Sequence, residues 1–299
     1  MVSGQRVTIR ACAKINLGLE VLGRRPDGYH DLVTVFQTVD LADELTVSFG
    51  GKGLRLVAAG LEVPDGRDNL CLRAAEIYFE AAGVEPAATV ELLKRIPIGA
   101  GLGGGSSDAA ATICALQWII GADVNLQALA AEIGSDVAFF INGGTALGEG
   151  RGERLSTSAR AASGNVVIAK PDLGISTAEA YGLLGPESYS AGAVTRRLFE
   201  RLQEGTRLLD SADMLVNVFQ PIVETRYPEV GVLREDMLAA GAAVAMLSGS
   251  GSAVFGLFAT ADQARDCAEA LRDKGYWIYV GEMIKYSSCA SDDVHREQR

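Results

Sequence analysis

A glycine-rich segment between an expected strand and an expected helix constrains the fold of this chain more than any other feature. Residues 97–108 read PIGAGLGGGSSD, and five of these twelve residues are glycine. The segment follows a strand-like run at residues 90–93 and precedes an alanine-rich, helix-like run that starts at Ala109. Glycine adopts positive φ without steric cost, and a helix start offers unpaired N–H groups and the positive end of the helix dipole. The segment therefore predicts a loop that binds phosphate rather than a flexible linker.

Spacing separates the kinds of phosphate loop. A Walker A loop needs a lysine at the helix start, but no lysine occurs between Arg95 and Lys170. Glycines 99, 101 and 104 match the Rossmann pattern, which normally follows the first strand and has an acidic residue closing the second strand. Here Asp123 follows an expected helix instead. We therefore expect a loop that binds phosphate through backbone amides and serine hydroxyls.

Composition excludes several other functions. The chain has 299 residues and a net charge of −11, which argues against a nucleic-acid partner. It has no apolar run long enough to span a membrane, and its first residues lack a signal core, so we expect a cytoplasmic protein. His30 and His295 are the only histidines, so a histidine metal cluster is excluded. The five cysteines have no paired spacing, and we expect reduced thiols.

The order of expected elements indicates an α+β protein. Apolar residues alternate with period two over residues 7–21, which places Lys14 and Asn16 together on the opposite face of a strand. Further expected strands and helices alternate irregularly along the chain. The strands are at 32–39, 45–49, 165–169, 253–258 and 277–280, with a hairpin at 145–155; the helices are at 70–82, 109–120, 126–133, 177–184, 193–203, 214–227, 230–240 and 261–274. The interpretation is a nucleotide-binding and catalytic domain at 1–163, a substrate-side domain at 164–287 and a disordered tail at 288–299.

Four segments in order resemble the motifs of the superfamily of galactokinase, homoserine kinase, mevalonate kinase and phosphomevalonate kinase. They are AKINLGLEVLGRRPDGYHDLVTVFQTVDLADEL at residues 13–45, DNL at 68–70 with the glycine-rich segment, GSDV at 134–137 and SGSG at 248–251. Within the superfamily, the first segment is most similar to the kinases of 4-diphosphocytidyl-2-C-methyl-D-erythritol. Ala100 and Ala138 depart from the pattern, and the residues after Lys285 do not match it.

The resemblance implies a fold and a reaction. The fold would combine an N-terminal domain like ribosomal protein S5 with a C-terminal ferredoxin-like α/β plait, and the active site would lie in the cleft between them. The reaction would be ATP-dependent phosphorylation of the 2-hydroxyl of the cytidylated polyol, in the non-mevalonate route to isoprenoids. The alternative is a sibling kinase that acts on mevalonate, homoserine or a sugar. A non-catalytic nucleotide-binding module and a dinucleotide-dependent oxidoreductase are rivals of other classes. We expect a monomer or a weak homodimer.

Two residues are the expected catalytic pair. By position alone, Lys14 could be a solvated strand lysine and Asp136 a helix cap. The resemblance implies instead that Asp136 accepts the proton of the substrate hydroxyl while Lys14 stabilises the alkoxide and the transferring phosphoryl group. It also implies that Asn16 orients the acceptor.

The base of the acceptor is expected at an aromatic site. The resemblance implies that Tyr29 stacks on cytosine and that His30 hydrogen-bonds to its edge. Tyr181 is expected to complete the stack, and Thr177 is expected to contact the acceptor. Tyr29 and His30 could equally form a packing lid, and Tyr181 could be a core residue of its helix.

ATP is expected along the glycine-rich segment, with Mg²⁺ bridging its phosphates. The expected contacts share this segment or the adenine end. They are Asn69, Lys94, Pro97, Ile98, Gly99, Ala100, Gly101, Leu102, Gly103, Gly104, Gly105, Ser106 and Ser107. Ser107 is the candidate metal ligand, although it could simply cap the helix, and Lys94 could be an exposed lysine at a strand end. The segment at residues 248–252 is expected to close the site beside the loop.

Overall fold

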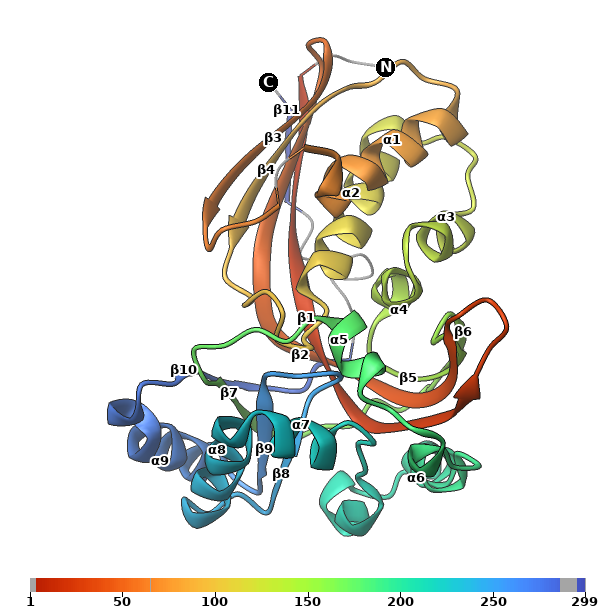
Figure 1. Cartoon of the computed structure of the whole chain (residues 1–299). Coiled ribbons are helices and arrows are strands. Elements are labelled where there is room, and N and C mark those ends of the chain that lie inside the picture. The colour runs from red at the N-terminus through yellow and green to blue at the C-terminus, as the bar shows by residue number, and fades with distance from the viewer. Residues whose placement is uncertain (1–3, 65, 286–294, 299) are drawn as a thin grey trace.

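The protein has two β-sheets, each with helices on one side, and two long strands of the larger sheet pack against the smaller sheet (Figure 1). The computed structural model describes residues 4–64, 66–285 and 295–298. Among these residues, no helix is both long and apolar enough to cross a membrane. The N-terminal part of the chain forms most of the larger sheet, and the C-terminal part forms the smaller sheet.

The larger sheet is built around a pair of strands of 20 residues each, β1 and β2. Its strand order is β11–β1–β2–β4–β3, and β5 pairs with the far half of β2 and with β6. The strands are β1 (Gln5–Arg24), β2 (His30–Phe49), β3 (Gly53–Gly60), β4 (Ala87–Lys94), β5 (Thr145–Gly150), β6 (Arg154–Thr157) and β11 (His295–Gln298). The expected alternation in β1 is present, but its central residues are buried on both faces. Both faces are buried because helices of the N-terminal part cover one, and the C-terminal part covers much of the other.

Helices of the N-terminal part pack on one face of this sheet (Figure 1). They are η1 (Gly66–Asp68), α1 (Leu70–Ala82), α2 (Gly104–Ile120), α3 (Leu126–Ile133) and α4 (Ser135–Asn142). Small alanine side chains let α2 pack closely on the sheet, and most of this helix is buried. Since α2 begins at the glycine-rich segment, this close packing fixes the loop relative to β1.

The smaller sheet confirms the expected ferredoxin-like plait. Its order β10–β7–β9–β8 is antiparallel throughout, and the chain visits these strands in the sequence βαββαβ. The strands are β7 (Asn165–Lys170), β8 (Val244–Leu247), β9 (Val254–Phe258) and β10 (Trp277–Glu282). The helices are α5 (Thr177–Gly182), η2 (Pro186–Ser188), α6 (Ala193–Gln203), η3 (Leu208–Met214), α7 (Gln220–Arg226), α8 (Pro228–Ala239), α9 (Ala261–Leu271) and η4 (Arg272–Lys274).

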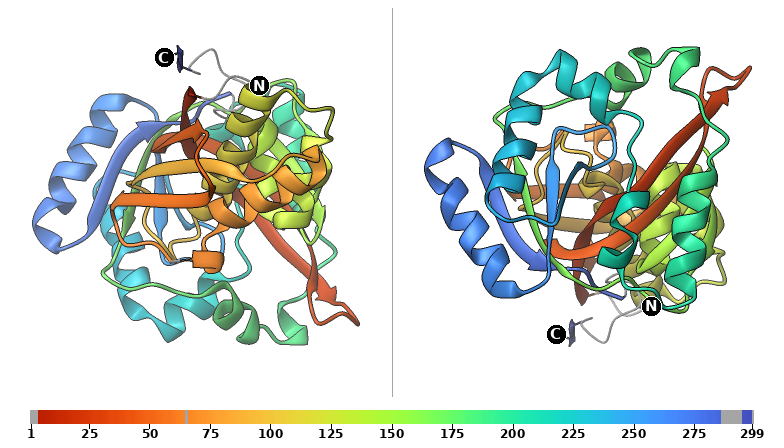
Figure 2. Two further views of the ribbon diagram at one scale, coloured as in Figure 1. Left: turned by 90° about the horizontal axis from the view of Figure 1, so that it is seen from above. Right: turned by 90° about the horizontal axis from the view of Figure 1, so that it is seen from below.

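The connection between β1 and β2 projects from the body of the protein, as the views from above and below show (Figure 2). Residues 25–29 form this turn, and Arg24 pairs with His30 at its base. The long strands therefore carry the first motif from the centre of the molecule, at Lys14, to an exposed tip at Tyr29.

Several expectations differ from the structure. The two strands expected at 32–39 and 45–49 are one strand, because Asp43 between them is buried and accepts hydrogen bonds from the backbone of Arg95 and Ile96. The helix expected at 214–227 begins only at Gln220, since Pro221 is tolerated in a first helical turn and not inside a helix. The sequence reasoning missed β3, β8 and α4.

The cysteine and tail expectations also differ in part. Cys71 and Cys267 are free thiols, but Cys114 is disulfide-bonded, so the expectation of reduced thiols is wrong there. Of the tail at 288–299, residues 288–294 and 299 lie outside the described residues. Residues 295–298 pair with the start of β1 as a strand.

Candidate active site

A large cavity lies where the glycine-rich loop, β1, α4 and α5 meet. Its volume is about 1360 Å³. Pockets for one drug-sized ligand usually hold about 300–1,000 Å³, so this cavity has room for two substrates side by side. The glycine-rich loop lines one end, and the projecting β1–β2 turn lines the other.

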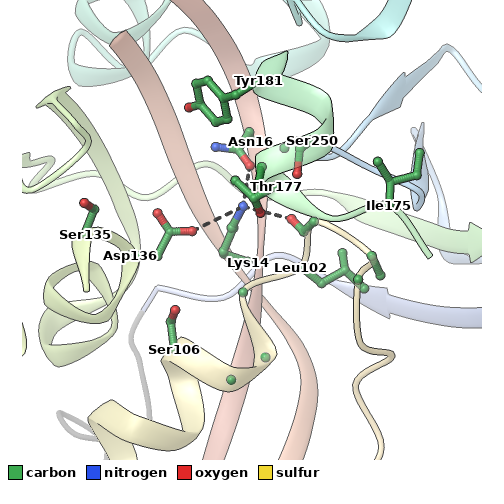
Figure 3. Close-up of a pocket in the computed structure, with 18 of the residues that line it drawn as sticks. Lys14, Asn16, Leu102, Ser106, Ser135, Asp136, Ile175, Thr177, Tyr181 and Ser250 are labelled. Carbon is green, nitrogen blue, oxygen red and sulfur yellow. Dashed lines mark hydrogen bonds and ion pairs between the residues drawn. The ribbon is translucent and has the colours of Figure 1, made fainter. Parts of the chain in front are cut away.

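Lys14 lies at the junction of the two ends (Figure 3). Its ammonium donates to Asn16 Oδ1 at 2.6 Å and to the carbonyl of Gly101 at 2.8 Å, and its Nζ lies 3.7 Å from Asp136 Oδ2. The residue is 4% exposed, which excludes the solvated lysine. Asn16 is in turn held by Thr34, to which its Nδ2 donates at 2.8 Å.

Burial and one carboxylate set the charge of this lysine. Loss of solvation lowers the pKa of Lys14 from its ordinary value, and the charge of Asp136 partly restores it. The Asp136 side chain is 36% exposed, so it can meet a ligand in the cavity while it faces the ammonium. Asp136 is in the first turn of α4, a helix of eight residues that sequence reasoning missed. The pair can therefore accept a proton at one atom and stabilise negative charge at a neighbouring one.

The glycine-rich loop is fixed by close backbone contacts. Gly101 has φ of +72°, and a Cβ atom there would lie 2.0 Å from the carbonyl oxygen of Ser248. Gly103 also has positive φ, and as the N-cap residue of α2 it has no side chain that could cap the helix. The first N–H groups of α2 therefore point from an uncapped helix start, which suits a phosphate.

Residues 248–252 lie beside the loop, as expected. Ser248 Oγ donates to the Gly101 carbonyl at 3.0 Å, and the N–H of Ser252 donates to the Gly99 carbonyl at 3.2 Å. Asn217, which sequence reasoning missed, donates to the carbonyls of Leu247 and Gly249 at 2.8 and 2.9 Å. It lies between η3 and α7 and belongs to no motif, so only the fold reveals its role.

Lys94 is at the end of β4 but is not exposed, which excludes the alternative of an exposed lysine at a strand end. It is 3% exposed and donates to Asp43 and to Asp108. Burial raises the pKa of Asp108 to about 8, although the Lys94 charge opposes this shift. Asn69 caps α1 by accepting from the N–H of Cys71 at 2.9 Å. Both Lys94 and Asn69 line the cavity, yet their polar groups already have protein partners.

The two serines of the loop differ. Ser106 lines the cavity (Figure 3), whereas Ser107 is 2% exposed and is not a lining residue. Ser107 Oγ donates to the carbonyl of Cys12 at 2.6 Å, so it fastens α2 to β1. Within the described part of the chain, no group of three or more His, Cys, Asp and Glu residues could hold a metal ion. The structure therefore gives no support to Ser107 as a metal ligand.

The other end of the cavity is aromatic. The His30 and Tyr181 rings lie 5.1 Å apart, between centroids, and Phe219 packs edge-on against Tyr181 at 4.9 Å. Tyr189, 6.1 Å from His30, also lines this end and was missed because it has no motif. Tyr29 is 57% exposed at the tip of the turn.

The protonation of this end is set mainly by burial. Burial lowers the pKa of His30, and the nearby charge of Arg24 lowers it further. The ring is therefore neutral at pH 7. Burial likewise raises the pKa of Tyr181, so its hydroxyl stays protonated. An aromatic slot with neutral polar edges suits an uncharged base.

The cavity brings together almost every predicted site residue. Its lining includes Lys14, Asn16, Tyr29, His30, Asn69, Lys94, Pro97, Ile98, Gly99, Ala100, Gly101, Leu102, Gly103, Gly104, Gly105, Ser106, Asp136, Thr177 and Tyr181. Ser107 is the exception. Such an arrangement can align an anionic donor at the loop with a base-bearing acceptor at the aromatic end.

Comparisons with known proteins agree with this geometry. Residues 69–144 match the model of the GHMP kinases N terminal domain, and residues 193–276 match that of the GHMP kinases C terminal. The chain is 42% identical over 278 residues to the 4-diphosphocytidyl-2-C-methyl-D-erythritol kinase of Pelotomaculum thermopropionicum, covering 92% of this chain and 96% of that one. It is 43% identical over 274 residues to the enzyme of the same name from Gloeobacter violaceus, covering 88% and 87%.

Solved structures of kinases are also similar to this protein. A crystal structure of 4-(cytidine 5'-diphospho)-2C-methyl-D-erythritol kinase matches with a TM-score of 0.80 and 40% identity, over 92% of this chain and 98% of that one. A homoserine kinase from Cytophaga hutchinsonii matches with a TM-score of 0.72 at 17% identity, over 99% and 98%, which indicates a shared fold.

Proposed function

Because the chain belongs to the 4-diphosphocytidyl-2-C-methyl-D-erythritol kinases, within the GHMP kinases, we propose that it transfers the γ-phosphate of ATP to the 2-hydroxyl of that cytidylated polyol. The step belongs to the non-mevalonate route to isoprenoid precursors. The observation that carries the proposal is the position of Lys14, which contacts the glycine-rich loop, Asn16 and Asp136 within one cavity large enough for both substrates.

The chemistry follows from this geometry. Asp136 accepts the proton of the acceptor hydroxyl as its oxygen attacks the γ-phosphorus, and the bond from the γ-phosphorus to the bridging oxygen of ADP breaks. The Lys14 ammonium stabilises the negative charge that develops on the attacking oxygen and on the transferring group. Because Lys14 is buried, this charge interaction is stronger than it would be in water. Asn16 presents its amide beside Lys14 and orients the acceptor.

ATP occupies the loop end of the cavity. Its phosphates meet the N–H groups of residues 99–105 and the uncapped start of α2, and Ser106 adds a hydroxyl. The adenine lies toward Asn69 and Lys94, whose side chains shape this end while they remain bound to their protein partners.

Magnesium is proposed to enter with the nucleotide. Asp68, Asp108 and Asp136 line the cavity, but the described residues contain no group of three or more His, Cys, Asp and Glu residues that could hold a metal ion. Mg²⁺ commonly keeps several waters and binds through substrate phosphates, so this sparse set fits a nucleotide-borne ion. A magnesium ion bound with the nucleotide would neutralise part of the phosphate charge.

The acceptor occupies the aromatic end. Cytosine stacks between Tyr29 and Tyr181, the neutral His30 meets its polar edge, and Thr177 contacts the acceptor near Lys14. This recognition of a base favours the cytidylated polyol over mevalonate or homoserine, which have no base. We further propose a domain boundary near residue 163, between β6 and β7, a cytoplasmic location, and a monomer or weak homodimer that binds neither nucleic acid nor membrane.

A panel of acceptors tests the proposal. Purified protein with ATP and Mg²⁺ is given the cytidylated polyol, the same polyol phosphate without cytidine, mevalonate or homoserine, and ADP release is measured. Release with the cytidylated acceptor alone supports the proposal. Equal release with mevalonate would show a sibling activity instead.

A further inference from the structure

Two arginines, Arg24 and Arg151, line the aromatic end of the cavity. Four cations line the cavity in the described part of the chain: Lys14, Lys94, Arg24 and Arg151. Lys14 faces Asp136, and Lys94 is paired with two buried carboxylates. Neither arginine forms an ion pair with any carboxylate among the described residues. The charge of Arg151 also acts on Asp27, but no ion pair forms between these two residues, so both guanidinium groups can still bind an anion in the cavity.

The strand register brings both arginines to the same place. Arg24 is opposite His30 in the β1–β2 pair. Leu32 is opposite Gly150 in the β2–β5 pair, so Arg151 leaves β5 beside the base of the same turn. The Arg151 guanidinium lies 5.0 Å from the centroid of the Tyr29 ring. Arg24, the last residue of β1, and Arg151, directly after β5, therefore both lie near the Tyr29–His30 pair.

The neighbouring arginines differ from these two. Arg25 is bound by Asp27 and Asp31, with its guanidinium 2.9 Å from an Asp31 oxygen. Arg196 is bound by Glu149 at 2.9 Å. Neither lines the main cavity. Unlike these two neighbours, Arg24 and Arg151 line the cavity and form no ion pair among the described residues.

We propose that Arg24 and Arg151 bind the diphosphate of the acceptor, and so make the nucleoside diphosphate rather than the base alone the recognised group. This inference rests on the proposed function. In a nucleoside diphosphate the phosphates lie one ribose away from the base, within the span of an arginine side chain at the base site. Guanidinium groups bind phosphate in paired hydrogen bonds. A chain with net charge −11 has no general attraction for anions, so local cations must supply it.

Binding measurements with two probes test the proposal. Cytidine and cytidine 5'-diphosphate are titrated into the full chain by calorimetry, with Arg24→Gln and Arg151→Gln. We expect each variant to lose about 5- to 50-fold in affinity for the diphosphate, the range for a partly solvated charged hydrogen bond, and to keep its affinity for cytidine. Arg24→Lys and Arg151→Lys should retain part of the diphosphate affinity. Added salt should weaken the binding of cytidine 5'-diphosphate to the wild-type protein and leave the binding of cytidine unchanged.

Arg154→Gln is the matched control. Arg154 is exposed on β6, forms no ion pair within the described residues and lies outside the main cavity, so its loss should leave both affinities unchanged. Unfolding midpoints verify that each variant is folded.

The failures of the two proposals differ. The proposed role of Arg24 and Arg151 is wrong, while the kinase assignment stands, if the wild-type protein binds cytidine and its diphosphate equally. The same holds if the glutamine variants lose equal affinity for both probes. If the wild-type protein binds neither probe, the proposal of a cytidylated acceptor is wrong, and so is the proposal that Arg24 and Arg151 bind its diphosphate.

Discussion

Replacing Asp136 with asparagine removes the proposed proton acceptor with little change in the shape of the side chain. Asparagine keeps the shape of the side chain, and this one is 36% exposed at the start of α4. The amide cannot accept the proton of the acceptor hydroxyl at neutral pH. General-base contributions are typically about 10²–10⁴-fold, which corresponds to roughly 3–5.5 kcal/mol in the activation free energy.

A second effect adds to the loss. Asp136 raises the pKa of Lys14 against the lowering caused by burial, so its neutralisation lowers that pKa further. The ammonium then loses its proton at a lower pH than in wild type. We therefore expect the alkaline limb of the pH–rate profile of Asp136→Asn to begin at lower pH.

The assay is single-turnover phosphoryl transfer with ATP, Mg²⁺ and the cytidylated polyol over a range of pH. The control is Asp68→Asn, which removes another carboxylate that lines the cavity at the nucleotide end. We expect a loss of at least about 10²-fold for Asp136→Asn and less than about 10-fold for the control. A folded Asp136→Asn protein with near-normal turnover would refute the role of this residue as base.

Three other perturbations test the site and its support. Gly101→Ala would place a Cβ atom 2.0 Å from the Ser248 carbonyl oxygen, so we expect it to lower the unfolding midpoint and raise the KM for ATP. Gly121→Ala is the control, because Gly121 has φ of +68° and open space around it, and this substitution should cost only the backbone strain of about 1–2 kcal/mol in folding free energy. Lys94→Met leaves the acidic groups of Asp43 and Asp108 buried without their cation, which should cost about 3–5 kcal/mol of stability, measured by denaturant unfolding. Cytidine affinity, measured by calorimetry, should be constant above pH 7 and fall as His30 is protonated, because burial lowers its pKa below 6.5 and favours the neutral ring.

Each of these expectations has a contradicting result. Equal loss of ATP affinity in both glycine variants would show that the Ser248 contact is unimportant. A stability of Lys94→Met within about 1 kcal/mol of wild type would show that its partners are satisfied in another way. Cytidine binding that strengthens below pH 6 would indicate that the protonated histidine is the binding form.

Local patterns predicted much of the fold. The helices α1 (Leu70–Ala82) and α3 (Leu126–Ile133) begin after asparagine caps that the sequence displays, and their predicted bounds agree with the structure. The glycine-rich loop was also predictable, because its glycines meet needs of the backbone itself: positive φ at Gly101 and a close approach by Ser248. These signals lie within a few residues of the feature they specify.

Features that depend on distant partners were not predictable in the same way. Asp43 looks like a strand end in the sequence but is buried, because Lys94 and two backbone N–H groups satisfy its carboxylate. Asn217 and Tyr189 reach the site from segments without a motif. Ser107 is a further example, because its hydroxyl donates to the carbonyl of Cys12, which is 95 residues away in the sequence.

The central claim is that the acceptor hydroxyl and the γ-phosphate meet at Lys14 and Asp136. A crystal structure with a non-hydrolysable ATP analogue, Mg²⁺ and the cytidylated polyol tests it most directly. We predict the acceptor 2-hydroxyl within about 2.6–3.2 Å of an Asp136 oxygen, with the γ-phosphate beside the Lys14 ammonium. A complex in which both ligands are bound but that hydroxyl points away from Asp136, or the phosphates lie away from the glycine-rich loop, would contradict the account.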